Sequence, residues 1–195
     1  MAFGERRRIV KKIDVRGIQS EPEKRLSFLT DFVGFTEDDW KALGESVEVL
    51  GPRLPGILDA LYDHLLNYDD TRKVFLGPRG EVDPNYIAIR KEHLTSWLLT
   101  TVGGSDRRAL ANYIMATGRR HTGVEGEPER VVPPRYMVAL TSFVQTAILS
   151  NLFDLLPNEP DKLRRIGLAW NKMMLIQLEM FLKALVPYWP RWDEA

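Results

Sequence analysis

Cysteine is absent from this sequence of 195 residues. Without thiols the chain cannot form disulfides, iron–sulfur clusters, cysteine-ligated zinc sites or a thiolate nucleophile. Sustained alternation of apolar and polar residues is also missing, and no Asn-Gly or Asp-Gly pair separates two β-branched runs, as a tight hairpin would require. These absences exclude thiol chemistry and predict an all-α protein.

An excess of charge of one sign is lacking too, since 27 Lys and Arg residues balance 27 Asp and Glu residues. The balance argues against a basic nucleic-acid-binding surface and against an acidic tail. No unbroken run of about eighteen apolar residues occurs, so no membrane span is expected. The basic N-terminus, MAFGERRRIVKKIDV, lacks the apolar core and cleavage site of a signal peptide. We therefore expect a cytoplasmic protein that binds neither nucleic acid nor membrane.

The common catalytic motifs are missing as well. The segment GPRG at residues 77–80 is a turn rather than a phosphate-binding loop, and the sequence contains neither H-E-x-x-H nor G-x-S-x-G. Inward-facing carboxylates for a di-iron centre are almost absent, and three histidines are too few and too scattered for a typical zinc site. A haem needs only one strong axial imidazole and a large apolar cavity, which this composition permits.

Start and stop signals divide the chain into seven to eight helices. The clearest start is Thr36, where Asp39 completes a capping box and Phe35 with Trp40 forms a hydrophobic staple. Ser105 is expected to cap a later helix. The other segments predicted as helical are bounded mainly by proline, glycine or capping residues and cover residues 21–32, 55–66, 69–76, 84–101, 134–156 and 160–186. We interpret residues 1–20 as an extended arm and residues 21–195 as a single domain.

One histidine is aligned with an apolar helix face. Leu110, Ile114, Thr117 and His121 follow one another at steps of four, three and four, so they share one side of the helix that follows Ser105. The other two histidines, at positions 64 and 93, are expected at the surface or at its boundary. From the residues alone, His121 is a candidate metal ligand, and a purely structural role for its ring stays open.

Two further polar residues lie on faces predicted to be buried. Tyr62 stands among leucines, so its hydroxyl either reaches the surface or needs a partner inside. Arg90 lies on the face of Ile87 and Leu94, and its guanidinium can extend outward or meet an anionic group at the mouth of a pocket. The long segment 160–186 is apolar around more of its circumference than one contact requires. This surplus predicts a homodimer through the last two long helices.

Four segments together resemble a known family. The segment GRRHTG…VVPPRYMVAL, with a histidine before a loop and Arg-Tyr after the prolines, resembles the protoglobins and the haem domains of globin-coupled sensors. The segments ILDALYDHLLNYDDTRKVF, NYIAIRKEHLTSWLLTT and AWNKMMLIQLEMFLKALVPYW continue the likeness in order over residues 20–190. It implies a globin fold with an additional N-terminal helix, bound haem b, and no space for a sensor output domain.

The resemblance also implies roles for individual residues. His121 would be the proximal ligand of the haem iron, and Tyr62 the distal hydrogen-bond donor. Leu61 and Leu94 stand where the family often has tryptophan and phenylalanine, which implies a less bulky and more accessible distal side. The residues expected to hold the haem are His121, Tyr62, Leu61, Leu94, Trp97, Phe75, Arg90, Met137, Leu140 and Val144.

The expected function is reversible binding of O2, CO or NO for gas sensing, scavenging or storage. Two alternatives stay open at this point. The same haem could carry out peroxidase-like, nitric oxide or nitrite chemistry, although the sequence offers no distal acid–base pair that would activate peroxide. Alternatively, the chain could be a haem-free helical module that acts through its dimer surface. Whether the protein is an enzyme is therefore left open.

Overall fold

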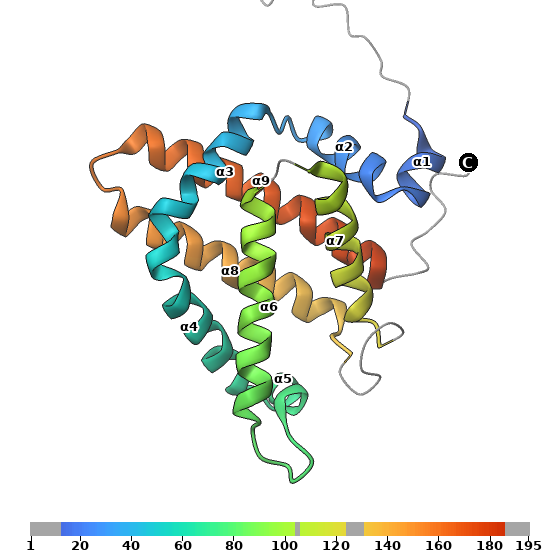
Figure 1. Cartoon of the computed structure of the whole chain (residues 1–195), viewed down its shortest axis with the longest axis vertical. Coiled ribbons are helices and arrows are strands. Elements are labelled where there is room, and N and C mark those ends of the chain that lie inside the picture. Colours follow the sequence, from blue (N-terminus) through green and yellow to red (C-terminus); the bar gives the residue numbers. More distant parts are fainter. Residues whose placement is uncertain (1–12, 104–105, 124–130, 186–195) are drawn as a thin grey trace, which may run out of the picture.

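The computed structural model describes residues 13–103, 106–123 and 131–185, and within these ranges its regular elements are helices (Figure 1). A single bridge between Leu76 and Val82 is the only pairing of extended backbone among them. The prediction of an all-α protein is confirmed. The elements are α1 (Val15–Ser20), α2 (Pro22–Phe32), α3 (Glu37–Leu50), η1 (Gly51–Arg53), α4 (Leu54–Leu66), α5 (Asp69–Arg72), η2 (Lys73–Phe75), α6 (Pro84–Gly103), α7 (Arg107–Arg120), α8 (Pro134–Leu155) and α9 (Pro160–Leu185).

The N-terminal segment differs from the expected extended arm. Val15–Ser20 form α1, because the Asp14 carboxylate accepts a hydrogen bond from the Gly17 backbone N–H at 3.0 Å and so caps the helix. Arg25 of α2 then ties this region to the core, since its guanidinium pairs with Glu179 of α9. The arm prediction is therefore wrong for α1, and residues 1–12 lie outside the described ranges.

The caps of α3 and α7 show how well local signals mark helix starts. Thr36 and Asp39 form the predicted capping box, and the rings of Phe35 and Trp40 meet edge to face with centroids 4.8 Å apart. In α7, however, Asp106 is the cap, because its carboxylate accepts from the backbone N–H of Ala109 at 2.8 Å. The predicted cap, Ser105, lies outside the described residues.

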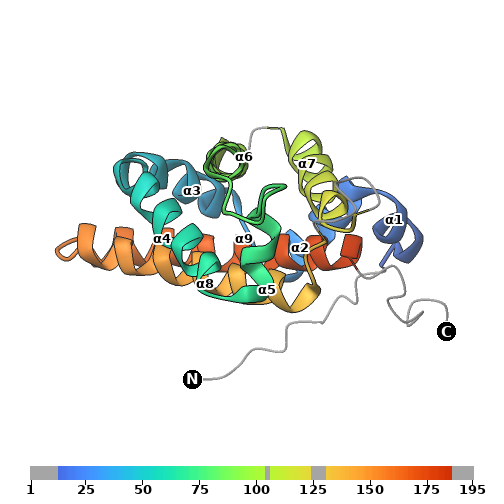
Figure 2. The ribbon, with the colours of Figure 1, turned by 90° about the horizontal axis from the view of Figure 1, so that it is seen from below.

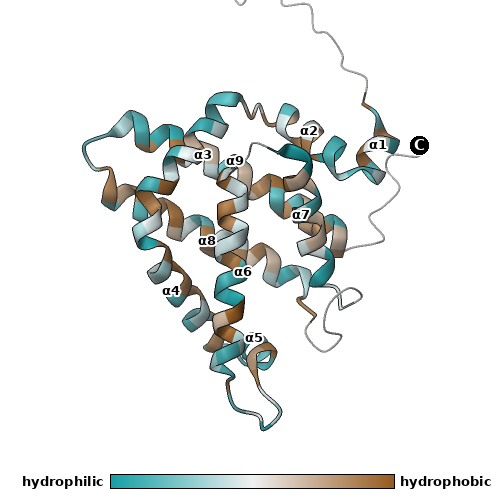
Figure 3. Ribbon diagram, viewed as in Figure 1, coloured by the Kyte–Doolittle hydropathy of each residue, from teal (hydrophilic) through white to brown (hydrophobic). Residues whose placement is uncertain are grey.

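The helices form two layers around α9. Figure 2 shows α8 and α9 lying together, with α3, α6 and α7 crossing above them. Figure 3 shows hydrophobic and hydrophilic residues intermixed along most helices, as expected of helices that bury one face. On α9 the side chains of Ile166, Met173, Ile176 and Met180 are fully enclosed by the neighbouring helices.

Among the described helices, α8 alone has the length and apolar composition that a membrane span would need. Polar residues interrupt the apolar runs of α8, so the sequence contains no unbroken stretch of about eighteen apolar residues here. A core helix passes the same test, and Val144, Ile148 and Leu152 of α8 are buried against the rest of the molecule. The composition of α8 therefore does not distinguish between the two settings.

Candidate functional site

A cavity of about 960 Å³ lies between α4, α6, α7, α8 and α9. Its volume is at the upper end of the range of about 300–1,000 Å³ that is usual for ligand and cofactor pockets. Figure 1 shows α6 running between α4 and α7, and residues of all three helices line the cavity. The structure places all the sequence-predicted site residues on this one cavity: His121, Tyr62, Leu61, Leu94, Trp97, Phe75, Arg90, Met137, Leu140 and Val144. Their roles in binding stay predictions.

The ring of His121 is oriented by the last turn of α7. Its Nδ1 lies 2.7 Å from the carbonyl oxygen of Thr117, and because a carbonyl can only accept, Nδ1 carries the proton and donates. The lone pair is therefore on Nε2, which has no protein partner within the described ranges. Burial lowers the pKa of His121 below its usual 6.5, against the opposing effect of the Thr117 hydrogen bond. The imidazole is thus neutral at pH 7, as a metal ligand must be.

The backbone around His121 is also held closely. The carbonyl of His121 accepts a hydrogen bond from the N–H of Val132 at 3.0 Å, which closes the chain after α7. One turn earlier, a Cβ added at Gly118 would lie only 2.8 Å from the Cβ of Ala184. Gly118 therefore allows α7 to approach α9 more closely than any other residue would. The position of the histidine depends on this contact.

Thr117 contributes a second polar group to the same wall. Its hydroxyl oxygen Oγ1 is buried and, among the described residues, has no hydrogen-bond partner. Thr117 lines the cavity, and an unpaired buried hydroxyl is unfavourable by roughly 1–3 kcal/mol. An occupant of the cavity that hydrogen-bonds to the Thr117 hydroxyl would remove this cost.

Tyr62 lies across the cavity on α4. Its ring is buried and meets Phe75 edge to face, with centroids 5.6 Å apart. Burial raises the pKa of Tyr62 to about 12, so the hydroxyl is protonated at neutral pH and can donate. Among the described residues the hydroxyl has no hydrogen-bond partner, although Tyr62 lines the cavity. The Tyr62 hydroxyl can therefore donate a hydrogen bond to a ligand in the cavity.

A buried network that the sequence reading did not identify fixes the indole of Trp97. Its Nε1–H donates to the side-chain carbonyl of Gln177 at 2.6 Å, and the Gln177 amide donates to the Thr101 hydroxyl at 2.9 Å. The Thr101 hydroxyl in turn donates to the Trp97 carbonyl at 2.9 Å. The only sequence signal for this network was Gln177 itself, which lies on the apolar face of α9, because a buried amide requires hydrogen-bond partners.

Charged groups lie at the mouth of the cavity, where α5 meets the start of α8. The Tyr136 hydroxyl donates to the Asp70 carboxylate at 3.0 Å, and Arg135 lies 3.7 Å from the same carboxylate. The hydrogen bond from Tyr136, followed by that from Lys73, holds the pKa of Asp70 below its ordinary value. Arg120 also lines the cavity, next to His121 in the sequence.

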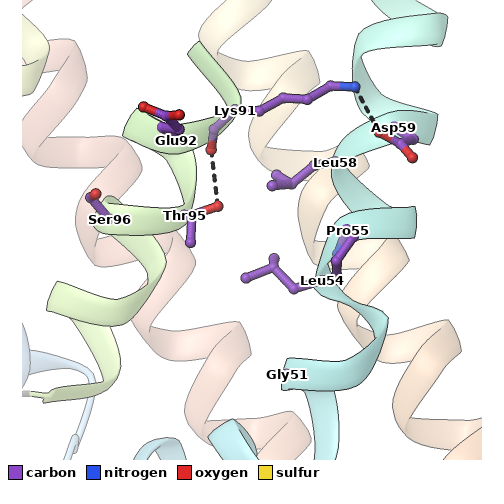
Figure 4. Close-up of a pocket in the computed structure, with 9 residues that line it drawn as sticks. All are labelled: Gly51, Leu54, Pro55, Leu58, Asp59, Lys91, Glu92, Thr95 and Ser96. Atoms are coloured by element: carbon purple, nitrogen blue, oxygen red, sulfur yellow. Dashed lines mark hydrogen bonds and ion pairs between the residues drawn. The ribbon is translucent and has the colours of Figure 1, made fainter. Parts of the chain in front are cut away.

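A second hollow, about 510 Å³ in volume, separates α4 from α6 (Figure 4). Leu54 and Leu58 of α4 form its apolar side, and Lys91 of α6 reaches across to Asp59 with Nζ and Oδ1 2.6 Å apart. Ser96 lines both this groove and the larger cavity. The α4 side of the cavity is thus less closely packed than the α7 side.

The described residues contain no group of three or more His, Asp or Glu side chains that could hold a metal ion by themselves. A metal at this site would therefore have to bring most of its own ligands, as the iron of a porphyrin does. The free Nε2 of His121, the unpaired Thr117 hydroxyl and the apolar walls are compatible with such a group.

Comparison with known proteins gives a family match and matches to solved structures. The family model described as Protoglobin matches residues 22–188. A solved structure, the globin domain of the globin-coupled sensor of Geobacter sulfurreducens, matches with a TM-score of 0.67 at 19% identity, covering 81% of this chain and 95% of that one. The structural likeness shows a globin fold. No curated protein sequence matches at a significant level.

Proposed function

Because this chain belongs to the Protoglobin family, we propose that its cavity binds haem through His121 and thereby takes up diatomic gases such as O2, CO or NO. The observation that carries the proposal is the state of the His121 ring. The ring is buried and neutral, its Nδ1–H is bound to Thr117, and its Nε2 is left without a protein partner at the cavity. This is the arrangement by which proteins present imidazole to a metal, with the second nitrogen tied to a backbone carbonyl.

Haem, when bound, would supply an iron atom that can take up a diatomic ligand. The residues of the chain provide the surroundings. Leu61, Leu94 and Val144 present apolar surface that would hold the porphyrin by burial and exclude water. Tyr62 offers a protonated hydroxyl, which can stabilise a ligand that carries negative charge by about 1.5–3 kcal/mol. Because CO carries less charge than O2 in such sites, the hydroxyl favours O2.

The proposal is tested by reconstitution with haemin. The wild-type protein should take up one haemin per chain and show an intense Soret band. His121→Ala should lower haemin affinity more than about a hundredfold, since even partners of a metal ligand contribute ten- to a hundredfold. His64→Ala is the matched control, because His64 stacks on Phe143 with centroids 4.8 Å apart and does not line the cavity. A wild-type protein that stays colourless with haemin contradicts the proposal.

We also infer a homodimer through the outer surface of α8 and α9. On α9, Leu168 and Leu175 are seven residues apart, so they share one side, and they are 47% and 50% exposed. On α8, Phe153 is 62% exposed. Such apolar side chains on adjacent helices favour self-association.

The oligomeric state tests this inference directly. Wild-type protein should elute as a dimer in size-exclusion chromatography with light scattering, and Leu175→Glu should shift it to monomer. Leu99→Glu on α6 is the matched control, since Leu99 is 51% exposed on a different face. A monomeric wild-type protein, or equal behaviour of the two variants, argues against this interface.

A further inference from the structure

The cavity carries more positive than negative charge. Three arginines line it, at positions 90, 120 and 135, whereas Asp70 is the only carboxylate of the described residues that does so. The Asp70 carboxylate already accepts from Tyr136 and Lys73. Within the described ranges the cavity therefore has an unbalanced positive potential, which favours anions.

Of these three arginines, Arg90 lies on α6, which also contributes Leu94 and Trp97 to the lining of the cavity. It precedes Leu94 by four residues and Trp97 by seven, so these three side chains share one face of α6, and all line the cavity. The Arg90 side chain is half-buried. Among the described residues it has no carboxylate partner, and its guanidinium carbon lies 5.7 Å from the centroid of the Tyr86 ring. The Tyr86 ring therefore helps to position this guanidinium, while no described carboxylate neutralises its charge.

A row of aromatic rings connects Arg90 with Tyr62. The Tyr86 ring lies 6.1 Å from the Phe75 ring, which in turn lies 5.6 Å from the Tyr62 ring, centroid to centroid. The charge of Arg90 also acts on both sides of the cavity, since it works to lower the pKa of Tyr62 and that of His121, in each case as a lesser effect than burial. The Arg90 and Tyr62 side chains both line the same cavity.

Building on the haem site proposed above, we propose that Arg90 and Tyr62 together make this side of the cavity a binding site for small inorganic anions of the nitrite and azide class. A guanidinium offers several N–H donors in a planar fork that can bond to the two oxygens of nitrite or to a terminal nitrogen of azide, and the phenol adds one more donor. Both act inside walls formed by Leu61, Leu94 and Phe75, where apolar surroundings strengthen charge-assisted hydrogen bonds. CO has no charge and gains nothing from Arg90.

The test compares charged with neutral ligands in the haem-loaded protein. Ferric wild-type protein, Arg90→Gln and Arg90→Lys are titrated with sodium azide and with sodium nitrite at pH 7, and binding is read from the Soret shift. We expect Arg90→Gln to lower the affinity for azide and for nitrite by about ten- to a hundredfold. The affinities of Arg90→Lys should lie between those of the wild-type protein and of Arg90→Gln. CO affinity of the ferrous protein should change less than about twofold. Arg79→Gln is the matched control, because Arg79 is exposed and pairs with Glu81 outside the cavity.

Haemin retention separates the possible outcomes. If Arg90→Gln leaves azide and nitrite affinity unchanged but releases haemin faster to an apomyoglobin trap, Arg90 serves the porphyrin carboxylates and the proposal is wrong. If all variants bind the anions equally and retain haemin equally, the proposal is wrong and Arg90 has no role in either. If the wild-type protein takes up no haemin at all, the proposed function fails and the anion site fails with it.

Discussion

The two sides of the cavity are built differently. On the α7 side, the His121 ring is tied to Thr117, the following chain is tied back by Val132, and Gly118 lets α7 lie directly against α9. On the α4 side, the Tyr62 hydroxyl has no partner among the described residues, and an open groove crossed by one ion pair separates α4 from α6. The difference suits the proposed function, because a metal ligand needs fixed geometry whereas a gas-binding side needs unused donors and space.

Among the tests of this difference between the two sides, the largest effect is expected from Tyr62→Phe on the α4 side. Because the hydroxyl has no described partner, Tyr62→Phe should change the unfolding free energy of the apoprotein by no more than about 0.5 kcal/mol. In the haem-loaded protein the same variant should release O2 about ten- to a hundredfold faster, and CO much less so, because a donor to a charged ligand is lost. Stopped-flow kinetics with both gases gives the two rates. Equal acceleration for O2 and CO would show that the hydroxyl acts by bulk alone.

Two glycines give the next largest contrast, this time in stability. Gly118→Ala places a methyl group 2.8 Å from the Ala184 Cβ, so it should destabilise the protein by about 1–3 kcal/mol. Gly56 lies in α4 with nothing within 4 Å of an added Cβ, so Gly56→Ala should stabilise the protein by about 0.4–1 kcal/mol. Urea unfolding of both variants measures the opposite signs. A harmless Gly118→Ala would show that α7 and α9 can move apart without loss of stability.

The sequence predicted the features that depend on near neighbours. The capping box of Thr36 with Asp39 lies within four residues, and the alignment of His121 with Leu110 and Ile114 follows from helical periodicity alone. The helix α1 was missed because a single side chain, Asp14, nucleates it within a stretch of mixed composition. Local periodicity was therefore sufficient for most helices and for placing His121 on the face of Leu110 and Ile114, while its role as a ligand stays a prediction.

Contacts between distant segments were not predictable in this way. The approach of Gly118 to Ala184 joins two helices, and the bond from Trp97 to Gln177 spans eighty residues of sequence. The unpaired hydroxyl of Thr117 also depends on what surrounds it in space. The sequence predicted which residues share a face of one helix. The packing of α6 and α7 against α9 was needed to show that the faces of these helices border one cavity.

A smaller effect is expected from pH on the stability of the apoprotein, through His121 on the α7 side. Burial lowers the pKa of His121 in the folded protein below its unfolded value of about 6.5, so the unfolded chain binds a proton more readily. The contribution of neutral His121 to stability is complete above pH 6.5 and is lost as the pH falls from there towards the lowered value. Apoprotein unfolding at pH 7.5 and 5.5 should therefore show a loss that is reduced in His121→Gln. An unchanged loss would assign the pH dependence to other groups.

The smallest effect concerns the ion pair across the groove on the α4 side. Lys91 and Asp59 are 2.6 Å apart, yet their side chains are 30% and 65% exposed, so solvent and salt screen them. A double-mutant cycle of Lys91→Ala and Asp59→Ala should give a coupling free energy of only about 0.2–1 kcal/mol, and it should decrease further in 1 M salt. A coupling of 2 kcal/mol or more that resists salt would mean that α4 is clamped to α6 as firmly as α7 is to α9. The cavity would then have two rigid sides, and the α4 side would have to admit ligands without any movement of its walls.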